Sequence, residues 1–164
     1  MIAEPGTVGQ QPLVELTWPE ITLAANIGTA RRLFAVERRL RNYGGGGPNA
    51  SEGWGEDIVG AIGEAGLAKH YNLFWSGTIG QWGGRDVGPF QVRAKTKPEY
   101  RLGIKEKDAD DQQFVSVLVD LPRVWLCGWF WGGEGKRDGW RDREQPYLFW
   151  VPTAALHPMA TLTV

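Results

Sequence analysis

The spacing of hydrophobic and polar residues predicts two helices in the first half of the chain. Apolar positions recur at roughly helical spacing over residues 19–43, after a start signal at Thr17-Trp18-Pro19-Glu20. Gly28 interrupts this segment and indicates a bend. A second helix is predicted over residues 56–71, which are rich in glycine and alanine. Because glycine costs about 1 kcal/mol relative to alanine in a helix, this composition favours a helix that lies very close against a sheet.

Short apolar runs separated by Gly, Pro and Asp clusters predict a sheet in the second half. The predicted strands are residues 73–76, 90–95, 101–105, 114–119, 124–131 and 147–151. Residues 132–145 are predicted to form a polar loop or short helix, and residues 152–156 a terminal helical turn. The 164 residues suit a single domain. We therefore expect a flexible N-terminal arm over residues 1–16 and an α/β domain over residues 17–164, with a mixed central β-sheet flanked by helices.

One predicted strand carries polar side chains next to an upstream aspartate. In residues 90–95, Gln91, Arg93 and Lys95 alternate with apolar residues, so these three side chains share one face of the strand. Asp86 lies just before this strand. Glu64 lies in the second predicted helix among small apolar residues, where an acid is usually unfavourable. The pattern therefore indicates a divalent-cation site beside a cationic group.

This combination of groups is typical of phosphodiester hydrolysis. In this hypothesis Glu64 and Asp86 bind Mg²⁺ or Mn²⁺, Gln91 completes the metal site, and Arg93 or Lys95 stabilises the negative charge that develops on the phosphate. Such a cation keeps several waters, so few protein ligands suffice. Three structural interpretations stay open beside it. Glu64 can lie on the solvent face of its helix, Asp86 can be a turn residue before a glycine, and the polar strand residues can be the wet face of an antiparallel strand.

Five short segments resemble the PD-(D/E)xK nuclease superfamily, in its glutamine-containing Mrr-like branch, and are also similar to small phage and actinobacterial proteins. The resemblance covers about residues 54–158. It implies a restriction-endonuclease-like fold and a Mg²⁺-dependent nuclease that acts on DNA. The segments are Gly60-Ala61-Ile62-Gly63-Glu64, Asp86-Val87-Gly88, Gln91-Val92-Arg93, Gly128-Trp129 and Val151-Pro152.

The chain departs from that pattern at the position of the family's lysine, which is Arg93. Arginine is not deprotonated in proteins, although it binds phosphate in a bidentate manner. Lys95 lies two residues further on the same face, and Gln91 lowers the negative charge of the metal site. These departures leave open a second function: a non-catalytic module on the same fold that binds nucleic acid or protein, such as a phage regulator or a counter-defence protein.

The charge of the chain bears on a nucleic-acid partner. A net charge of −1 and a pI near 6.1 argue against a polybasic binder and leave room for a local basic groove. The basic second half of the first helix predicts either phosphate contacts or a solvated face, and comprises Arg31, Arg32, Arg38, Arg39 and Arg41. The residues predicted to line a nucleic-acid groove are Trp82, Arg85, Lys136, Arg137, Trp140 and Arg141.

Nine tryptophans in one chain require an explanation of their own. In residues 124–131, strict alternation predicts one face with Trp125, Cys127, Trp129 and Trp131 and another with Val124, Leu126 and Phe130. Because both faces are apolar, we expect a central buried strand. The alternative is a stacking surface, which makes a carbohydrate-binding module a third hypothesis.

Cys127 is the single cysteine, so an internal disulfide is impossible and a reducing compartment is the simplest interpretation. The first eleven residues lack a signal-peptide pattern, and the longest apolar run is too short for a membrane span of about 20 residues. We therefore expect a cytoplasmic protein that contacts no membrane. Homo-oligomerisation stays open.

Overall fold

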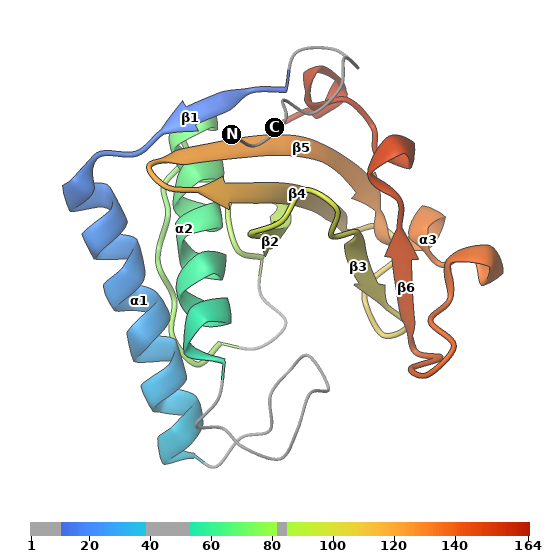
Figure 1. Ribbon diagram of the computed structural model, residues 1–164, viewed down its shortest axis with the longest axis horizontal. Coiled ribbons are helices and arrows are strands. Elements are labelled where there is room, and N and C mark those ends of the chain that lie inside the picture. The colour runs from blue at the N-terminus through green and yellow to red at the C-terminus, as the bar shows by residue number, and fades with distance from the viewer. Residues whose placement is uncertain (1–10, 39–52, 82–84) are drawn as a thin grey trace.

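The computed structural model describes residues 11–38, 53–81 and 85–164, which form two long helices and two sheets (Figure 1). The helices are α1 (Trp18–Glu37) and α2 (Trp54–Tyr71), followed late in the chain by the single turn α3 (Gly132–Gly135). The strands are β1 (Leu13–Glu15), β2 (Phe90–Lys95), β3 (Leu102–Lys105), β4 (Gln113–Asp120), β5 (Arg123–Trp131) and β6 (Leu148–Val151). Short 3₁₀ turns lie at Asp138–Trp140, Thr153–Ala155 and Met159–Thr161.

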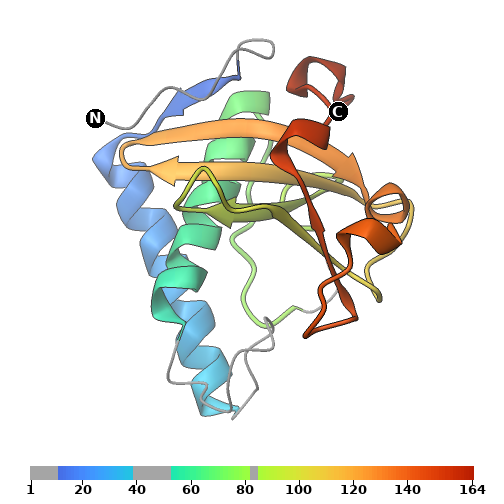
Figure 2. The ribbon, with the colours of Figure 1, turned by 45° about the vertical axis from the view of Figure 1, so that its right-hand side comes forward.

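The larger sheet is mixed and has the strand order β1-β5-β4-β2. β2 runs parallel to β4, whereas β4–β5 and β5–β1 are antiparallel. β3 and β6 form a separate antiparallel pair on the side away from the helices (Figure 2). The coarse prediction of an α/β fold with a mixed sheet and flanking helices is therefore confirmed.

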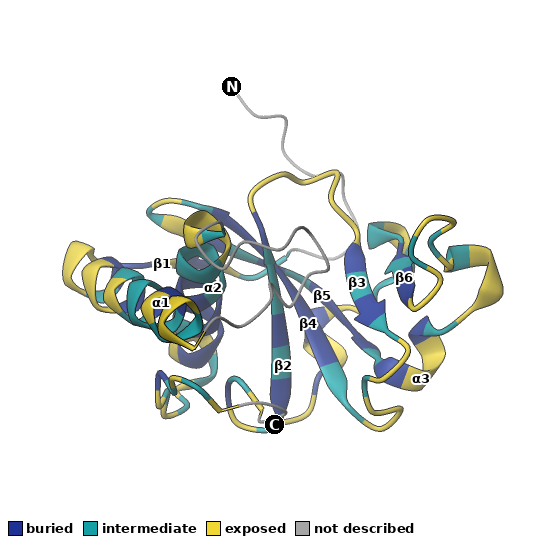
Figure 3. Cartoon of the chain, turned by 90° about the horizontal axis from the view of Figure 1, so that it is seen from below, coloured by how far each residue is buried: buried dark blue, intermediate teal, exposed yellow. Residues whose placement is uncertain are grey.

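The buried residues lie mainly between α2 and the larger sheet, and a smaller cluster lies between the two sheets (Figure 3). Two glycines of α2 explain its close approach. A Cβ at Gly63 would lie 2.8 Å from the Ala94 side chain, and one at Gly66 would lie 2.5 Å from the Val124 side chain. The prediction from the small residues of this helix is thus confirmed.

α1 packs against α2, and Gly28, the residue predicted to mark a bend, is a point of close contact between the two helices. A Cβ at Gly28 would lie 2.5 Å from the Ile58 Cα, so only glycine lets the two backbones meet here. A capping box between Thr17 and Glu20 starts α1 as predicted. The helix ends at Glu37, earlier than the predicted residue 43, and residues 39–43 lie outside the described part of the chain.

Residues 72–81 form an extended loop that lies against α1, so the strand predicted at 73–76 is wrong. Gly77 and Gly80, with φ of +56° and +71°, bring this loop against Ile27 and Phe34 of α1. The alternation that suggested a strand reflects Leu73 and Trp75 turning towards the core while Phe74 is 87% exposed. The other five predicted strands are present within one or two residues.

Two further features differ from the sequence prediction. Leu13–Glu15, inside the segment expected to be an arm, forms β1 against the end of β5, and Val14 is buried there. Ser116 of β4 lies opposite Gly128 of β5, whereas Val117 lies opposite Leu126, so Cys127 is an extra residue of β5 in a β-bulge.

The bulge overturns the predicted faces of β5. Beyond Cys127 the alternation reverses, so Trp129 joins Val124 and Leu126 in the main core, and Phe130 faces the smaller cluster. Trp129 is only 7% exposed, and its indole donates to Pro158 and Thr161, so it offers no stacking surface.

Within the described residues, no helix combines the length and apolarity needed to cross a bilayer.

Candidate functional site

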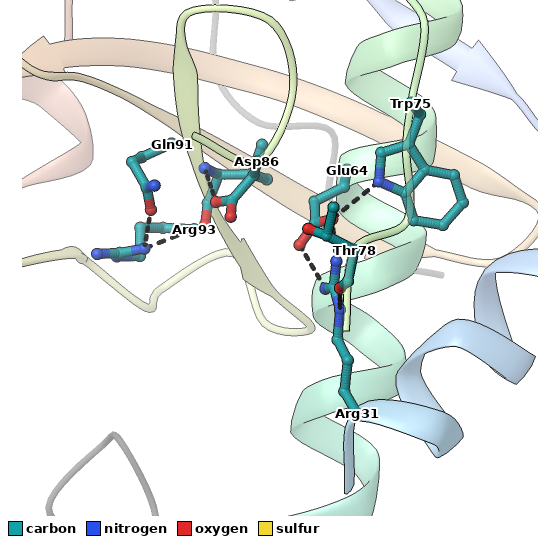
Figure 4. A network of polar contacts seen from close by, with 8 residues as sticks. Arg31, Glu64, Trp75, Thr78, Asp86, Gln91 and Arg93 are labelled. Atoms are coloured by element: carbon teal, nitrogen blue, oxygen red, sulfur yellow. Dashed lines mark hydrogen bonds and ion pairs between the residues drawn. The ribbon is translucent and has the colours of Figure 1, made fainter. Parts of the chain in front are cut away.

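Glu64 lies on the inner side of α2 and is 5% exposed. Its carboxylate receives a bidentate pair of hydrogen bonds from Arg31 of α1, at 2.7 Å to Oε1 and 2.8 Å to Oε2 (Figure 4). The Trp75 indole donates a third hydrogen bond to Oε2 at 2.9 Å. A buried carboxylate needs such partners, because desolvation without them is very costly. Glu64 is thus held in one orientation by groups from a helix and a loop.

Arg31 is anchored as firmly as the carboxylate that it binds. Its Nε donates to the Thr78 carbonyl at 3.0 Å, so the guanidinium connects α1, α2 and the loop after α2. Burial alone would lower the pKa of Arg31, but hydrogen bonding to Glu64 and the charges of Glu64 and Asp86 raise it. Arg31 therefore faces both predicted metal-binding carboxylates as a permanent cation.

Asp86 lies in the turn that leads into β2, beside Glu64 in Figure 4. Its Oδ2 accepts the Val92 backbone N–H at 2.8 Å, while its own backbone N–H donates to the Phe90 carbonyl at 2.9 Å. The turn interpretation of Asp86 is therefore correct, and it does not exclude a second role. Burial, followed by the negative charge of Glu64, raises the pKa of Asp86 to about 6, against smaller lowering effects from Val92 and Arg93.

Gln91 and Arg93 lie on the same half-buried face of β2, at one end of the strand order β1-β5-β4-β2. Arg93 donates to the Gln91 side-chain oxygen at 3.2 Å, and its guanidinium lies 4.9 Å from the centre of the Phe114 ring. It also contacts the Asp108 carboxylate at 3.5 Å. Since β2 pairs in parallel with β4, the interpretation of these residues as the wet face of an antiparallel strand is wrong.

Lys95 belongs to the same strand but has different partners. Its Nζ donates to the carbonyls of Pro98 and Tyr100 and to the Thr153 hydroxyl, and the residue is 7% exposed. Burial lowers the pKa of Lys95 below its usual value. The structure therefore directs this ammonium to the loop after β2, whereas Arg93 is the cation that lies beside Gln91.

Two cations near the site were not recognised from the sequence as part of it. The sequence places Arg31 in a basic helix segment, although its spacing of three residues from Gly28 puts it on the face that packs against α2. Lys105, at the end of β3, is half-buried, and burial together with the charge of Arg93 lowers its pKa to about 8. Its backbone N–H and the Arg93 guanidinium share the Asp108 carboxylate.

The residues predicted to contact nucleic acid lie on several segments. Trp82 is outside the described residues, and Arg85 is exposed immediately before Asp86. Lys136 is held by the Asp108 carbonyl and the Asp110 carboxylate, which places the loop after β5 next to Asp108.

That loop stacks its arginines on aromatic rings. The Arg137 guanidinium lies 4.5 Å from the centre of the Trp140 ring, and Trp140 itself packs against the smaller core cluster. Arg141 lies 4.4 Å from the centre of the Phe149 ring and pairs with Glu106 at 3.0 Å. Lys136 and Arg141 of the predicted groove are thus paired with carboxylates, whereas Arg85 and Arg137 have no carboxylate partner among the described residues.

The donor atoms of the site suit a hard cation. Glu64 and Asp86 provide carboxylate oxygens and Gln91 an amide oxygen, which are the ligand types that Mg²⁺ and Mn²⁺ prefer. Among the described residues Oδ1 of Asp86 has no hydrogen-bond donor, so it is available to a ligand. No set of three or more His, Cys, Asp or Glu side chains in the described residues is arranged to hold a metal, and the predicted set includes only two carboxylates.

Comparisons with protein-family models, with curated proteins and with solved structures give no match for this chain.

Proposed function

We propose that the protein is a Mg²⁺- or Mn²⁺-dependent nuclease that hydrolyses phosphodiester bonds in DNA, on a restriction-endonuclease-like fold. The observation that carries this proposal is that Asp86, from the turn before β2, lies beside Glu64 of α2, with Gln91 and Arg93 of β2 on the other side of Asp86. Burial and the negative charge of Glu64 raise the pKa of Asp86, which is unfavourable for the fold alone and typical of functional sites.

A divalent cation would be held by Asp86 and Glu64, with Gln91 as a neutral third ligand. When bound, such a cation polarises a phosphoryl oxygen and lowers the pKa of a bound water. The negative charge of the two carboxylates favours its binding, and no donor from the described residues occupies Oδ1 of Asp86. The residues present therefore fit the metal that the sequence pattern implies.

The cations around the carboxylates suit a phosphate group. Arg93 presents a planar guanidinium beside Gln91, which is the geometry that binds phosphate through two parallel hydrogen bonds. Lys105 adds a second positive charge near Arg93, and its pKa of about 8 allows a fraction of neutral amine at neutral pH. Arg85 and Arg137, both exposed, are available for neighbouring phosphates of the same strand.

The test is a cleavage assay on labelled single- and double-stranded DNA and RNA with Mg²⁺, Mn²⁺ or EDTA. We expect wild-type protein to cut DNA only with the metal, and Asp86→Ala to lose this activity. Asp111→Ala is the matched control, because Asp111 is exposed and its replacement gives the same net charge as Asp86→Ala. Cleavage that survives Asp86→Ala would contradict the proposal.

A second function is favoured by one specific observation. Arg31 already neutralises Glu64, and Arg93 replaces the lysine of the nuclease pattern, so the site suits a non-catalytic module that binds nucleic acid or a protein. Such a module retards labelled DNA in a gel equally well with EDTA and with Mg²⁺, and cuts none of the substrates. A nuclease, in contrast, binds Mn²⁺ in the absence of nucleic acid.

A further inference from the structure

The Glu64 carboxylate has few positions left for another ligand. An ionised carboxylate has about four lone-pair positions. The two nitrogens of Arg31 take one position on each oxygen, and Trp75 takes a second position on Oε2. In the part of the chain that the structure describes, no group takes the last position, which is on Oε1. A divalent cation placed there would lie next to the Arg31 guanidinium, which repels it.

Arg31 is fixed in this position by more than its ion pair. The Thr78 carbonyl holds its Nε at 3.0 Å, and the close helix contact at Gly28 brings this part of α1 within reach of α2. The side chain of Arg31 is 22% exposed and that of Glu64 is 7% exposed. The guanidinium is therefore built into the site, in contrast to a surface arginine that drifts away at little cost.

We propose that Arg31 is a positioning residue that competes with the divalent cation for Glu64, so that the cation binds Asp86 first and reaches Glu64 only when the guanidinium moves. This inference rests on the proposed function, because it concerns the metal site of that nuclease. It assigns Arg31 a definite effect: the arginine weakens metal binding in the free protein. A merely structural arginine would keep its contacts with Glu64 and Thr78 when the metal binds, so its Nε–H signal would not move.

The first experiment measures Mn²⁺ binding by equilibrium dialysis without nucleic acid. We expect Arg31→Met to bind Mn²⁺ about tenfold or more tightly than wild type, because a neighbouring positive charge is removed. Arg32→Met is the matched control. Arg32 follows on the same helix and is 5% exposed, and its ion pair with Asp57 at 2.7 Å involves neither Glu64 nor Asp86. We expect this control to bind Mn²⁺ like wild type.

A second experiment uses the wild-type protein and does not depend on the folding of a variant. The Nε–H of Arg31 and the Nε1–H of Trp75 each report on this network by NMR, since one donates to Thr78 and the other to Glu64. We expect both signals to shift during a Mg²⁺ titration, with the same saturation curve. Asp86→Asn should abolish both shifts.

The outcomes separate the two proposals. Equal Mn²⁺ affinities in wild type and Arg31→Met, or Asp86-dependent Mg²⁺ binding that moves neither NMR signal, would overturn the role of Arg31 and leave the nuclease in place. If wild type and Arg31→Met both fail to bind a metal, the proposed function and this inference fail together.

Discussion

Replacing Asp86 with asparagine should stabilise the protein at neutral pH. Burial and the charge of Glu64 raise the pKa of Asp86 to about 6, from a usual value of 3.8. A carboxyl group whose folded-state pKa is raised destabilises the fold wherever it is ionised in both states. That cost is absent at pH values below the pKa of the unfolded state. It grows as the pH rises from about 4 to about 6, and it is fully present above the pKa of the folded state. Asparagine has nearly the same shape, and its amide oxygen can still accept the Val92 N–H.

The magnitude follows from the same pKa. One pKa unit corresponds to about 1.4 kcal/mol, so ionising Asp86 in the fold costs about 3 kcal/mol at pH 7.5 and about 1 kcal/mol at pH 4.5. The attraction of Asp86 to Arg93 and Arg31 is already included, because it is among the causes of the net shift. We therefore expect the stabilisation by Asp86→Asn to shrink by about 2 kcal/mol between these two pH values.

The assay is urea unfolding followed by tryptophan fluorescence at both pH values, for wild type, Asp86→Asn and the exposed control Asp111→Asn. The comparison of variant with wild type at each pH removes the contribution of other groups. These include Glu20, whose pKa is lowered chiefly by hydrogen bonding to Lys69. The control should change stability by no more than about 0.5 kcal/mol at either pH. An Asp86→Asn variant that is less stable than wild type by the same amount at both pH values would refute the reasoning.

Three further predictions concern the ion pair, the helix packing and the phosphate-binding cation. Arg31→Met should lower the free energy of unfolding by about 3–5 kcal/mol, because it leaves the buried Glu64 carboxylate without its cation. The surface variant Arg123→Met should lower it by less than about 1 kcal/mol. Equal losses for the two variants in urea unfolding would contradict this. Gly66→Ala should lower the free energy of unfolding by about 1–3 kcal/mol, because the added Cβ meets Val124 of the sheet. Gly60→Ala adds a Cβ in open space and should raise it by up to about 1 kcal/mol. Thermal unfolding of both variants checks the packing of α2. Arg93→Lys should retain DNA cleavage and Arg93→Ala should lose about 100-fold in kcat, and a fully active alanine variant would remove Arg93 from the site.

The sequence predicted those parts of the fold that depend on local periodicity. The two helices and five strands follow from apolar spacing, and the close approach of α2 follows from its small residues. The strand at 73–76 was wrong because side chains that anchor a loop alternate in the same way as those of a strand. The exchange of faces in β5 depends on the bulge at Cys127, which involves the register with β4 and has no local signal.

The candidate site was predictable where its residues stand out from their local sequence. Glu64 stands out because an acid in an apolar helix is unusual, and Asp86 stands out because the strand after it carries alternating polar side chains. Arg31 was missed because a cluster of arginines on a helix usually indicates a solvated face, and its partner lies 33 residues away. Lys105 reaches the site only through the position of β3, which no pattern in the chain specifies.

The charges at this site are difficult to explain by stability alone. Apolar residues of similar size in place of a buried ion pair are often neutral or stabilising, so the Arg31–Glu64 pair is not required to hold α1 against α2. The close contact at Gly28 and the glycines of α2 already account for that packing. Asp86 adds a second carboxylate whose ionisation is unfavourable in the fold. A chain that keeps both carboxylates beside two arginines is best explained by a ligand that carries charge of both signs. A metal-bound phosphate fits this description, because in the proposed function the carboxylates would bind the cation and the arginines would bind the anion.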